Sequence, residues 1–88
     1  MEKIEQDVVV NNPHGLHVRS AGLFVQIANK YDSEVRLARG DNAVEGKSIM
    51  ELLTLGVNQG SIVHLVVDGV DAQEAFKELK EYLEKGDD

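Results

Sequence analysis

The stretch Ile62-Val63-His64-Leu65-Val66-Val67, "IVHLVV", decides the fold because it separates two kinds of pattern in the chain. Apart from its histidine it is β-branched and apolar, which is typical of a strand in the middle of a sheet. Gly69 ends this strand. Beyond the glycine, apolar residues recur at helical spacing and predict an amphipathic helix of about 14 residues. The residues of this apolar stripe are Ala72, Ala75, Phe76, Leu79, Tyr82 and Leu83.

Upstream of this stretch, strand and helix periods alternate. Ile4, Val8 and Val10 fall on alternate positions, and Val35 and Leu37 do so again, which predicts two strands with one buried face each. A Gly-Asp-Asn turn at 40–42 predicts a hairpin. The expected elements are strands over residues 3–10, 35–39, 43–45 and 62–67 and helices over 18–30, 48–55 and 72–83.

The resulting order is β-α-β-β-α-β-α, in a single domain over residues 1–88 with no visible repeat or linker. We expect an α+β fold: a four-stranded antiparallel sheet with three helices on one face. The other face of the sheet is expected to stay open to solvent.

Composition excludes several classes of function. The formal net charge is -7, from nine Lys and Arg against sixteen Asp and Glu, so no basic stripe is available for nucleic acid. Cysteine is absent, which excludes disulfides and thiolate chemistry. No apolar run approaches the roughly 20 residues of a membrane helix, and the charged N-terminus does not resemble a signal peptide. We expect a cytoplasmic protein without membrane insertion.

The stretch "NPHGLHVRS", residues 12–20, holds two of the three histidines. Two histidines three residues apart suggest a metal site, but His14 lies in a Pro-Gly loop and His17 begins a helix, so they share no helical face. A metal-binding protein using His14, His17 and His64 remains a distant alternative. A hydrolase is disfavoured because no Gly-x-Ser-x-Gly elbow exists.

His17 at a helix N-terminus indicates phosphate chemistry instead. Free N–H groups and the helix dipole favour an anion there. The same partial positive charge disfavours an imidazolium, so we expect a neutral, nucleophilic imidazole that can accept and pass on a phosphoryl group. Arg19 can stabilise that group, although a cation in the first turn opposes the dipole. The alternative is that His17 merely caps the helix and Arg19 is a solvated residue.

A second candidate site is the segment 46–60, "GKSIMELLTLGVNQG". Ser48 followed three residues later by Glu51 predicts a capping box. Ile49, Met50 and Leu53 cannot all face the core of so short a helix, so an exposed apolar surface for docking is expected. The alternative is that these residues only close the edge of the core.

These two motifs, in this order and at this spacing, resemble the HPr family of histidine-containing phosphocarriers of the bacterial phosphotransferase system. "GLHVR" (residues 15–19) is similar to the family's phosphohistidine motif Gly-Leu-His-Ala-Arg-Pro, and segment 46–60 is similar to its regulatory-serine segment. The resemblance covers nearly the whole chain. It implies the family's open-faced β-sandwich.

The resemblance also implies functional roles. His17 would accept phosphate on Nδ1 from phospho-enzyme I, with phosphoenolpyruvate as ultimate donor, and pass it to IIA-type domains that serve sugar transport. Arg19 would steady the phosphoryl group, and Ser48 would be the target of an HPr kinase/phosphorylase. No cofactor and no metal are implied, and we expect a monomer. The docking surface would comprise Val18, Ser20, Ile49, Met50 and Leu53.

Three departures from the family pattern bear on this reading. Ser20 stands where the family usually has proline, which removes a rigid helix start. Val18 is bulkier than the usual residue, and Glu51 is acidic where many members are not. None removes the phosphorylatable histidine that some regulatory variants lack. The alternative function is a regulatory HPr paralogue that acts by phosphorylation-dependent docking to a regulator.

Overall fold

Four strands and three helices follow one another along residues 2–86, the part of the chain that the computed structural model describes. The predicted order β-α-β-β-α-β-α is confirmed. The elements are β1 (Glu2–Val9), α1 (Val18–Ala28), β2 (Glu34–Arg39), β3 (Asn42–Glu45), α2 (Ile49–Thr54), β4 (Ile62–Gly69) and α3 (Ala72–Lys85).

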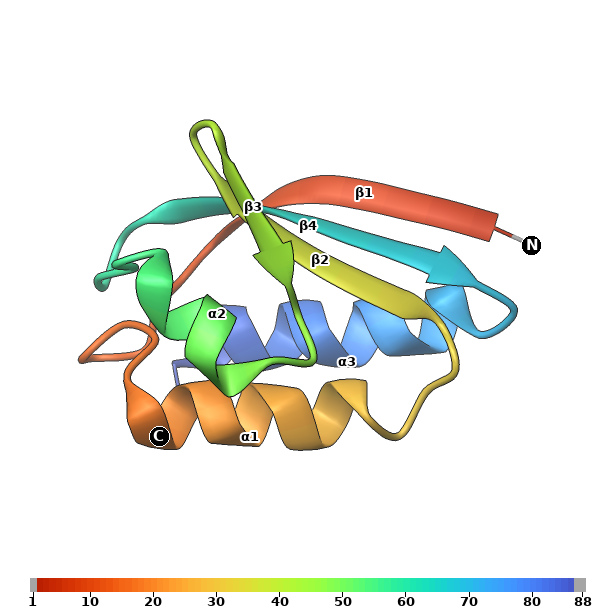
Figure 1. Ribbon diagram of the computed structural model, residues 1–88, viewed down its shortest axis with the longest axis horizontal. Coiled ribbons are helices and arrows are strands. Elements are labelled where there is room, and N and C mark those ends of the chain that lie inside the picture. Colours follow the sequence, from red (N-terminus) through yellow and green to blue (C-terminus); the bar gives the residue numbers. More distant parts are fainter. Residues whose placement is uncertain (1, 87–88) are drawn as a thin grey trace.

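The strands form one antiparallel sheet in the order β1-β4-β2-β3. The strand that contains "IVHLVV" is therefore an inner one, paired on both edges, as its composition predicts. Figure 1 shows the sheet as one layer, with α1 and α3 lying side by side beneath it and α2 beside the start of α1. The predicted open-faced α+β architecture is thus confirmed.

The core lies between the sheet and the helices. Val63, Leu65 and Val67 of β4 are fully buried, and they meet the buried apolar stripe of α3, which includes Leu79 and Leu83. Truncating such a leucine to alanine typically costs about 2–5 kcal/mol of stability. The alternate β4 residues, His64 among them, lie on the open face of the sheet and remain partly or fully exposed.

Element ends differ slightly from the sequence prediction. The first helix ends at Ala28 rather than at residue 30, because the N–H of Lys30 bonds the carbonyl of Ile27, three residues back, and tightens the last turn. Gly56 adopts a φ of +63° directly after the C-cap of α2, as expected for a helix-terminating glycine. Among residues 2–86, no helix is long and apolar enough to cross a membrane.

Candidate functional site

The loop between β1 and α1 is fastened to two segments far away in the sequence. The backbone N–H of Asn11 donates to the carbonyl of Leu83 at 2.9 Å, and its side-chain amide donates to the carbonyl of Glu84 at 2.7 Å. Further along, the N–H of Leu16 donates to the carbonyl of Val57 at 3.1 Å. The loop is therefore held between the end of α3 and the segment that follows α2.

Gly15 makes the second fastening possible. Its φ is +67°, and a Cβ at this position would overlap the carbonyl of Val57 and stand only 2.7 Å from the Cα of Asn58. Only glycine combines that dihedral with so close an approach of two backbones. The residue sets the distance between the loop and the start of α1.

His17 is the N-cap of α1. Its backbone is extended, with φ −102° and ψ −174°, and its carbonyl accepts from the N–H of Ala21 at 2.8 Å. Its imidazole Nδ1 accepts from the N–H of Arg19 at 3.3 Å. The half-buried ring therefore lies against the amide groups at the positive end of the helix.

Ser20 completes a reciprocal capping box with His17. The N–H of His17 donates to the Ser20 hydroxyl oxygen at 3.0 Å, and the hydroxyl donates to the carbonyl of Gly15 at 2.8 Å. The helix thus has a fixed start without a proline. Because Ser20 is fully buried, the prediction that it belongs to the docking surface does not hold for its side chain.

The rings of His14 and His17 meet edge to face, with centroids 5.7 Å apart and planes at 77°. No group of three potential metal ligands was found among residues 2–86. His64 lies on the open sheet face, where Glu5 and Asp7 each approach one ring nitrogen at 2.8 Å. The three histidines therefore do not form one cluster.

The carboxylates around His64 change its protonation. The hydrogen bonds with Glu5 and then Asp7 raise the pKa of His64 above its ordinary value of 6.5. In return, the hydrogen bond with His64 lowers the pKa of Glu5. The three groups join β1 to β4 on the sheet face opposite the helices.

Arg19 follows His17 by two residues and is exposed. Within the described part of the chain, its guanidinium forms no ion pair with a carboxylate. The first turn of α1 contains no acidic residue. Arg19 is thus a cation next to the positive end of a helix, an arrangement that an anionic group would stabilise.

Ser48 is the N-cap of α2, and its hydroxyl accepts from the N–H of Glu51 at 3.2 Å. The predicted capping box is only half formed. The N–H of Ser48 donates to the carbonyl of Glu45, and the Glu51 carboxylate accepts from the N–H of Glu45 at 3.0 Å instead. The N–H of Ser48, which Glu51 was expected to bind, is thus used by the turn before the helix.

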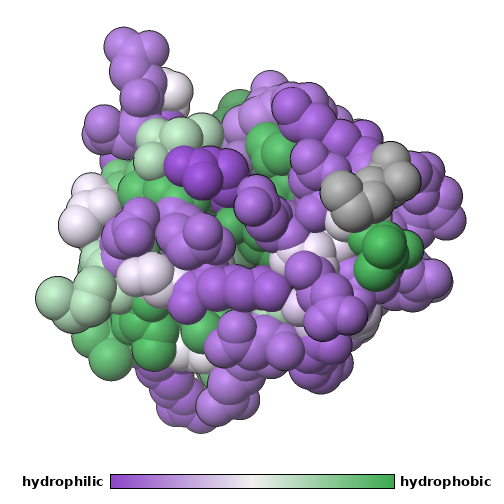
Figure 2. Space-filling model, turned by 45° about the vertical axis from the view of Figure 1, so that its right-hand side comes forward, coloured by the Kyte–Doolittle hydropathy of each residue, from purple (hydrophilic) through white to green (hydrophobic). Residues whose placement is uncertain are grey.

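Apolar side chains are exposed where α1 and α2 meet. Val18 is 68% exposed and Met50 77%, whereas Ile49 is 38% exposed and Leu53 is half-buried against the core. Ile49 lies beside Gly22, one turn along α1 from Val18, with its Cδ1 3.9 Å from where a glycine Cβ would stand. The surface in Figure 2 is mostly hydrophilic, with apolar side chains in small separate groups.

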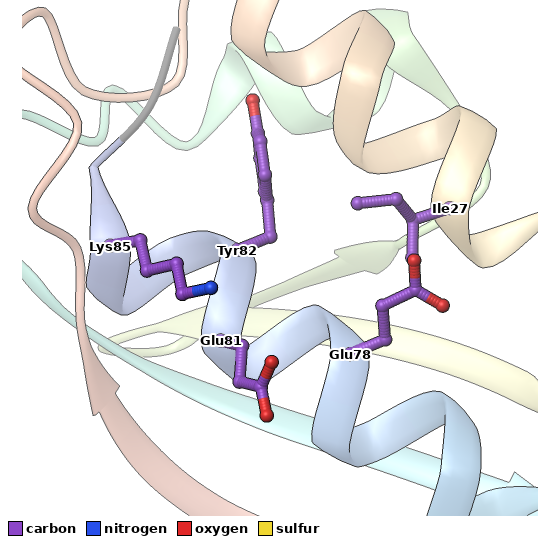
Figure 3. A pocket seen from close by; sticks show the side chains of 5 residues that line it. All are labelled: Ile27, Glu78, Glu81, Tyr82 and Lys85. Carbon is purple, nitrogen blue, oxygen red and sulfur yellow. The ribbon is translucent and has the colours of Figure 1, made fainter.

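A shallow pocket of about 230 Å³ lies between α1 and α3. Figure 3 shows the five side chains that line it, and the Tyr82 ring rises from α3 toward α1. The Tyr82 hydroxyl donates to the carbonyl of Ser20 at 3.0 Å. Glu78, which also lines the pocket, accepts a hydrogen bond from the Tyr31 hydroxyl, and this bond raises the pKa of Tyr31 to about 12. The pocket reaches the candidate site only through Tyr82. Its lining residues are Ile27, Glu78, Glu81, Tyr82 and Lys85.

Sequence reasoning identified His17 and Ser48 at their helix starts but missed residues that hold these two helices in place. Ser20 could have been recognised by its spacing of three from His17, which is the spacing of a capping box. Tyr82 and Arg39 gave no local signal. The Arg39 guanidinium bonds the carbonyls of Leu55 and Gly56 at 2.9 and 2.8 Å and closes the end of α2.

The open-faced α+β sandwich with a histidine at the start of its first helix agrees with the class that the sequence motifs resemble, the small histidine phosphocarriers. Residues 4–85 match the family model described as the PTS HPr component phosphorylation site. The chain belongs to the HPr family of phosphocarrier proteins of the phosphotransferase system.

Relatives of two kinds share this fold. The chain is 40% identical to the phosphocarrier protein HPr of Mycoplasma pneumoniae, over 97% of this chain and 96% of that protein. It is 42% identical to the HPr-like protein Crh of Bacillus subtilis strain 168, over 93% of this chain and 96% of that protein. The crystal structure of an HPr from Bacillus anthracis superposes with a TM-score of 0.91 at 32% identity, covering 96% of this chain and all of that one.

Proposed function

We propose that this chain carries phosphoryl groups on His17, accepting them from phospho-enzyme I and passing them to IIA-type domains. The observation that supports this most directly is the place of the imidazole: it caps α1, with Nδ1 3.3 Å from the N–H of Arg19. A nucleophile in this position meets its anionic product at the positive end of a helix.

In the transfer step, the lone pair of Nδ1 attacks the phosphorus atom. The Nδ1–P bond forms while the bond from phosphorus to the donor breaks, and the donor keeps that electron pair. The Arg19 N–H that now donates to Nδ1 is released to the phosphoryl oxygens. The exposed guanidinium of Arg19 neutralises part of their charge. The same steps in reverse deliver the group to the next acceptor.

The test is labelling from radioactive phosphoenolpyruvate with enzyme I, using wild type and His17→Ala. Wild type is expected to take up an acid-labile label, and His17→Ala none. His14→Ala is the matched control, because its ring touches His17 but belongs to the exposed loop. Label that survives in His17→Ala, or a wild type that takes none, contradicts the proposal.

Ser48 is proposed as the site of regulatory phosphorylation by an HPr kinase/phosphorylase. The residue is half-buried, and it lies at a helix start that tolerates a phosphate. ATP-dependent label that survives acid and disappears in Ser48→Ala is expected. Label that remains in Ser48→Ala places the modification elsewhere.

Partners are proposed to dock on the apolar surface formed by Val18, Ile49, Met50 and Leu53. It adjoins His17 through Val18, and methionine adapts to partners of different shape. Met50→Glu is expected to raise the KM of enzyme I for the chain, whereas Val70→Glu, an equally exposed apolar residue beyond β4, is the control.

A regulatory role like that of a Crh protein is the second candidate, because the chain is as similar to Crh as to HPr sequences. Such a module would take the label on His17 or Ser48 and bind a regulator. It would fail to pass label from His17 to any IIA-type domain. His17 in its capped geometry favours the relay.

We propose that the chain is a cytoplasmic monomer. A Crh crystal structure, with TM-score 0.78 to this chain and 41% identity over 94% and 95% of the two chains, is described as a dimer with a swapped domain. Here β1 pairs with its own β4 along its whole length. Light scattering that gives twice the chain mass would contradict the monomer.

A further inference from the structure

The side chain of Ser20 joins two of the residues that precede α1, Gly15 and His17. It accepts the N–H of His17 at 3.0 Å and donates to the carbonyl of Gly15 at 2.8 Å. The serine is fully buried, so its bond to the Gly15 carbonyl is shielded from water, and its bond with the His17 N–H is partly shielded. One hydroxyl thereby fixes the chain on either side of Leu16.

The backbone of Ser20 is fixed from another direction. Its carbonyl accepts the hydroxyl of Tyr82, which stands on α3, 62 residues further along the chain. Figure 3 shows the Tyr82 ring pointing from α3 toward α1. The serine that holds His17 is therefore itself attached to a second helix.

This attachment determines where the imidazole stands. Side-chain rotamers are staggered about the backbone, so the ring moves with the φ and ψ of His17. At the observed values its Nδ1 lies 3.3 Å from the N–H of Arg19. Group transfer is sensitive to such placement, and an error of about 1 Å can cost roughly a hundredfold in rate.

We propose that Ser20 is a positioning residue for phosphoryl transfer, acting through the His17 N–H and the Gly15 carbonyl. The inference rests on the proposed function of His17. Because Ser20 is buried, it acts without touching enzyme I or any acceptor. Removing the Ser20 hydroxyl must therefore lower kcat and leave the KM for this chain unchanged.

The experiment compares Ser20→Ala with Ser33→Ala in the enzyme I reaction. Ser33 is also buried, and its hydroxyl bonds Asp71 at the opposite end of α3, away from His17. We expect Ser20→Ala to lower kcat roughly tenfold at unchanged KM, because the histidine loses its tether. Ser33→Ala is expected to keep the wild-type kcat while losing comparable stability.

Two further variants test the hydroxyl of Ser20 and the bond to its carbonyl separately. Ser20→Thr keeps it and is expected to restore most of the rate. Tyr82→Phe removes the bond to the Ser20 carbonyl, and we expect kcat to fall roughly threefold. NMR signals of the imidazole nitrogens, measured in the same variants without any enzyme, are expected to change in Ser20→Ala and not in Ser33→Ala.

Three results would overturn the role of Ser20. They are an unchanged kcat in Ser20→Ala, an equal fall in Ser33→Ala, and a folded Ser20→Thr as slow as the alanine variant. If Ser20→Thr does not fold, the comparison of the two alanine variants decides. A wild-type chain that takes no label overturns the proposed function and this inference together, whereas an active wild type isolates the role of Ser20.

Discussion

The starts of α1 and α2 use similar parts and are held differently. Each helix has an N-cap whose side chain accepts a backbone N–H, His17 at α1 and Ser48 at α2. At α1 a second side chain, that of Ser20, closes the box from inside the protein. At α2 the return bond is missing, because Glu51 binds Glu45.

The two starts differ in which hydrogen bonds still hold the helix when the capping atom is phosphorylated. Nδ1 of His17 can turn from the Arg19 amide to a phosphorus atom while the Ser20 bonds still hold the helix start. The Ser48 hydroxyl is both the cap and the candidate phosphorylation site, so its modification requires the first turn of α2 to find a new acceptor. The first start suits repeated turnover, and the second suits a change of state.

The largest effect is expected from Gly15→Ala, which acts on the loop that supports the α1 start. The added methyl group would overlap the carbonyl of Val57, so we expect a loss of about 3 kcal/mol or more in the free energy of unfolding. Gly40→Ala is the control. Gly40 also has a positive φ but has nothing within 4 Å of its Cβ position, and about 1 kcal/mol is expected. Equal losses in urea unfolding would refute the close-approach argument.

The next effect concerns charge, which differs between the two starts. The first turn of α1 has no acidic residue, whereas that of α2 has Glu51. Arg19→Ala is expected to slow phosphoryl transfer about tenfold, or about 1.4 kcal/mol in barrier, and to stabilise the fold by a few tenths of a kcal/mol. Arg36→Ala, on the open sheet face, should change neither. A rate equal to wild type would show that Arg19 is only a solvated residue.

Ser48→Ala is expected to have a smaller effect, on stability alone. Losing an N-cap hydroxyl costs about 1 kcal/mol, and Ser48→Thr should recover most of it. Phosphoenolpyruvate-dependent label on His17 should remain at the wild-type level, because the α1 start has its own bonds. A loss of that label would show that the two starts are coupled.

The smallest effect is expected away from the starts of α1 and α2, where His64 bonds Glu5 and Asp7 on the open face of the sheet. Its raised pKa means that its stabilisation is complete below pH 6.5 and is lost as the pH rises through the folded-state value. Protonation of Glu5 removes the ion pair again in acid, and the lowered pKa of Glu5 moves that loss below the ordinary range of a glutamate. Since the His64 side chain is 39% exposed, we expect only a few tenths of a kcal/mol. The free energy of unfolding, measured with urea from about pH 5 to about pH 9, should depend less on pH in His64→Gln than in wild type. Labelling of His17 should be unaffected.

The fold could be predicted from the sequence because its signals are periodic and local. The composition of "IVHLVV" indicated an inner strand, and the apolar stripe of 72–83 indicated a helix against it. The helix expected over 48–55 is followed by Gly56, which has the positive φ that glycine favours at a helix end. Each of these patterns reports the environment of its own element.

The supports of the site could not be predicted in the same way. His17 was recognised as a residue at a helix start, but the partners of Ser20 depend on a loop fastened at Val57 and on a tyrosine 62 residues away. A serine in place of a proline therefore suggested a loosened helix start, whereas its hydroxyl fixes that start. Burial of Ser20 depends on tertiary packing, which no local pattern contains.

The fastening of Asn11 to Leu83 and Glu84 also has a consequence in time. A ribosome makes His17 before it makes the carbonyls of Leu83 and Glu84, which hold the preceding loop and lie 72 and 73 residues beyond Asn11. Chains fold from the N-terminus as they emerge, yet this loop cannot close until α3 has been made. A chain that has not yet been made as far as Glu84 therefore presents His17 before the loop that precedes it is fastened to α3.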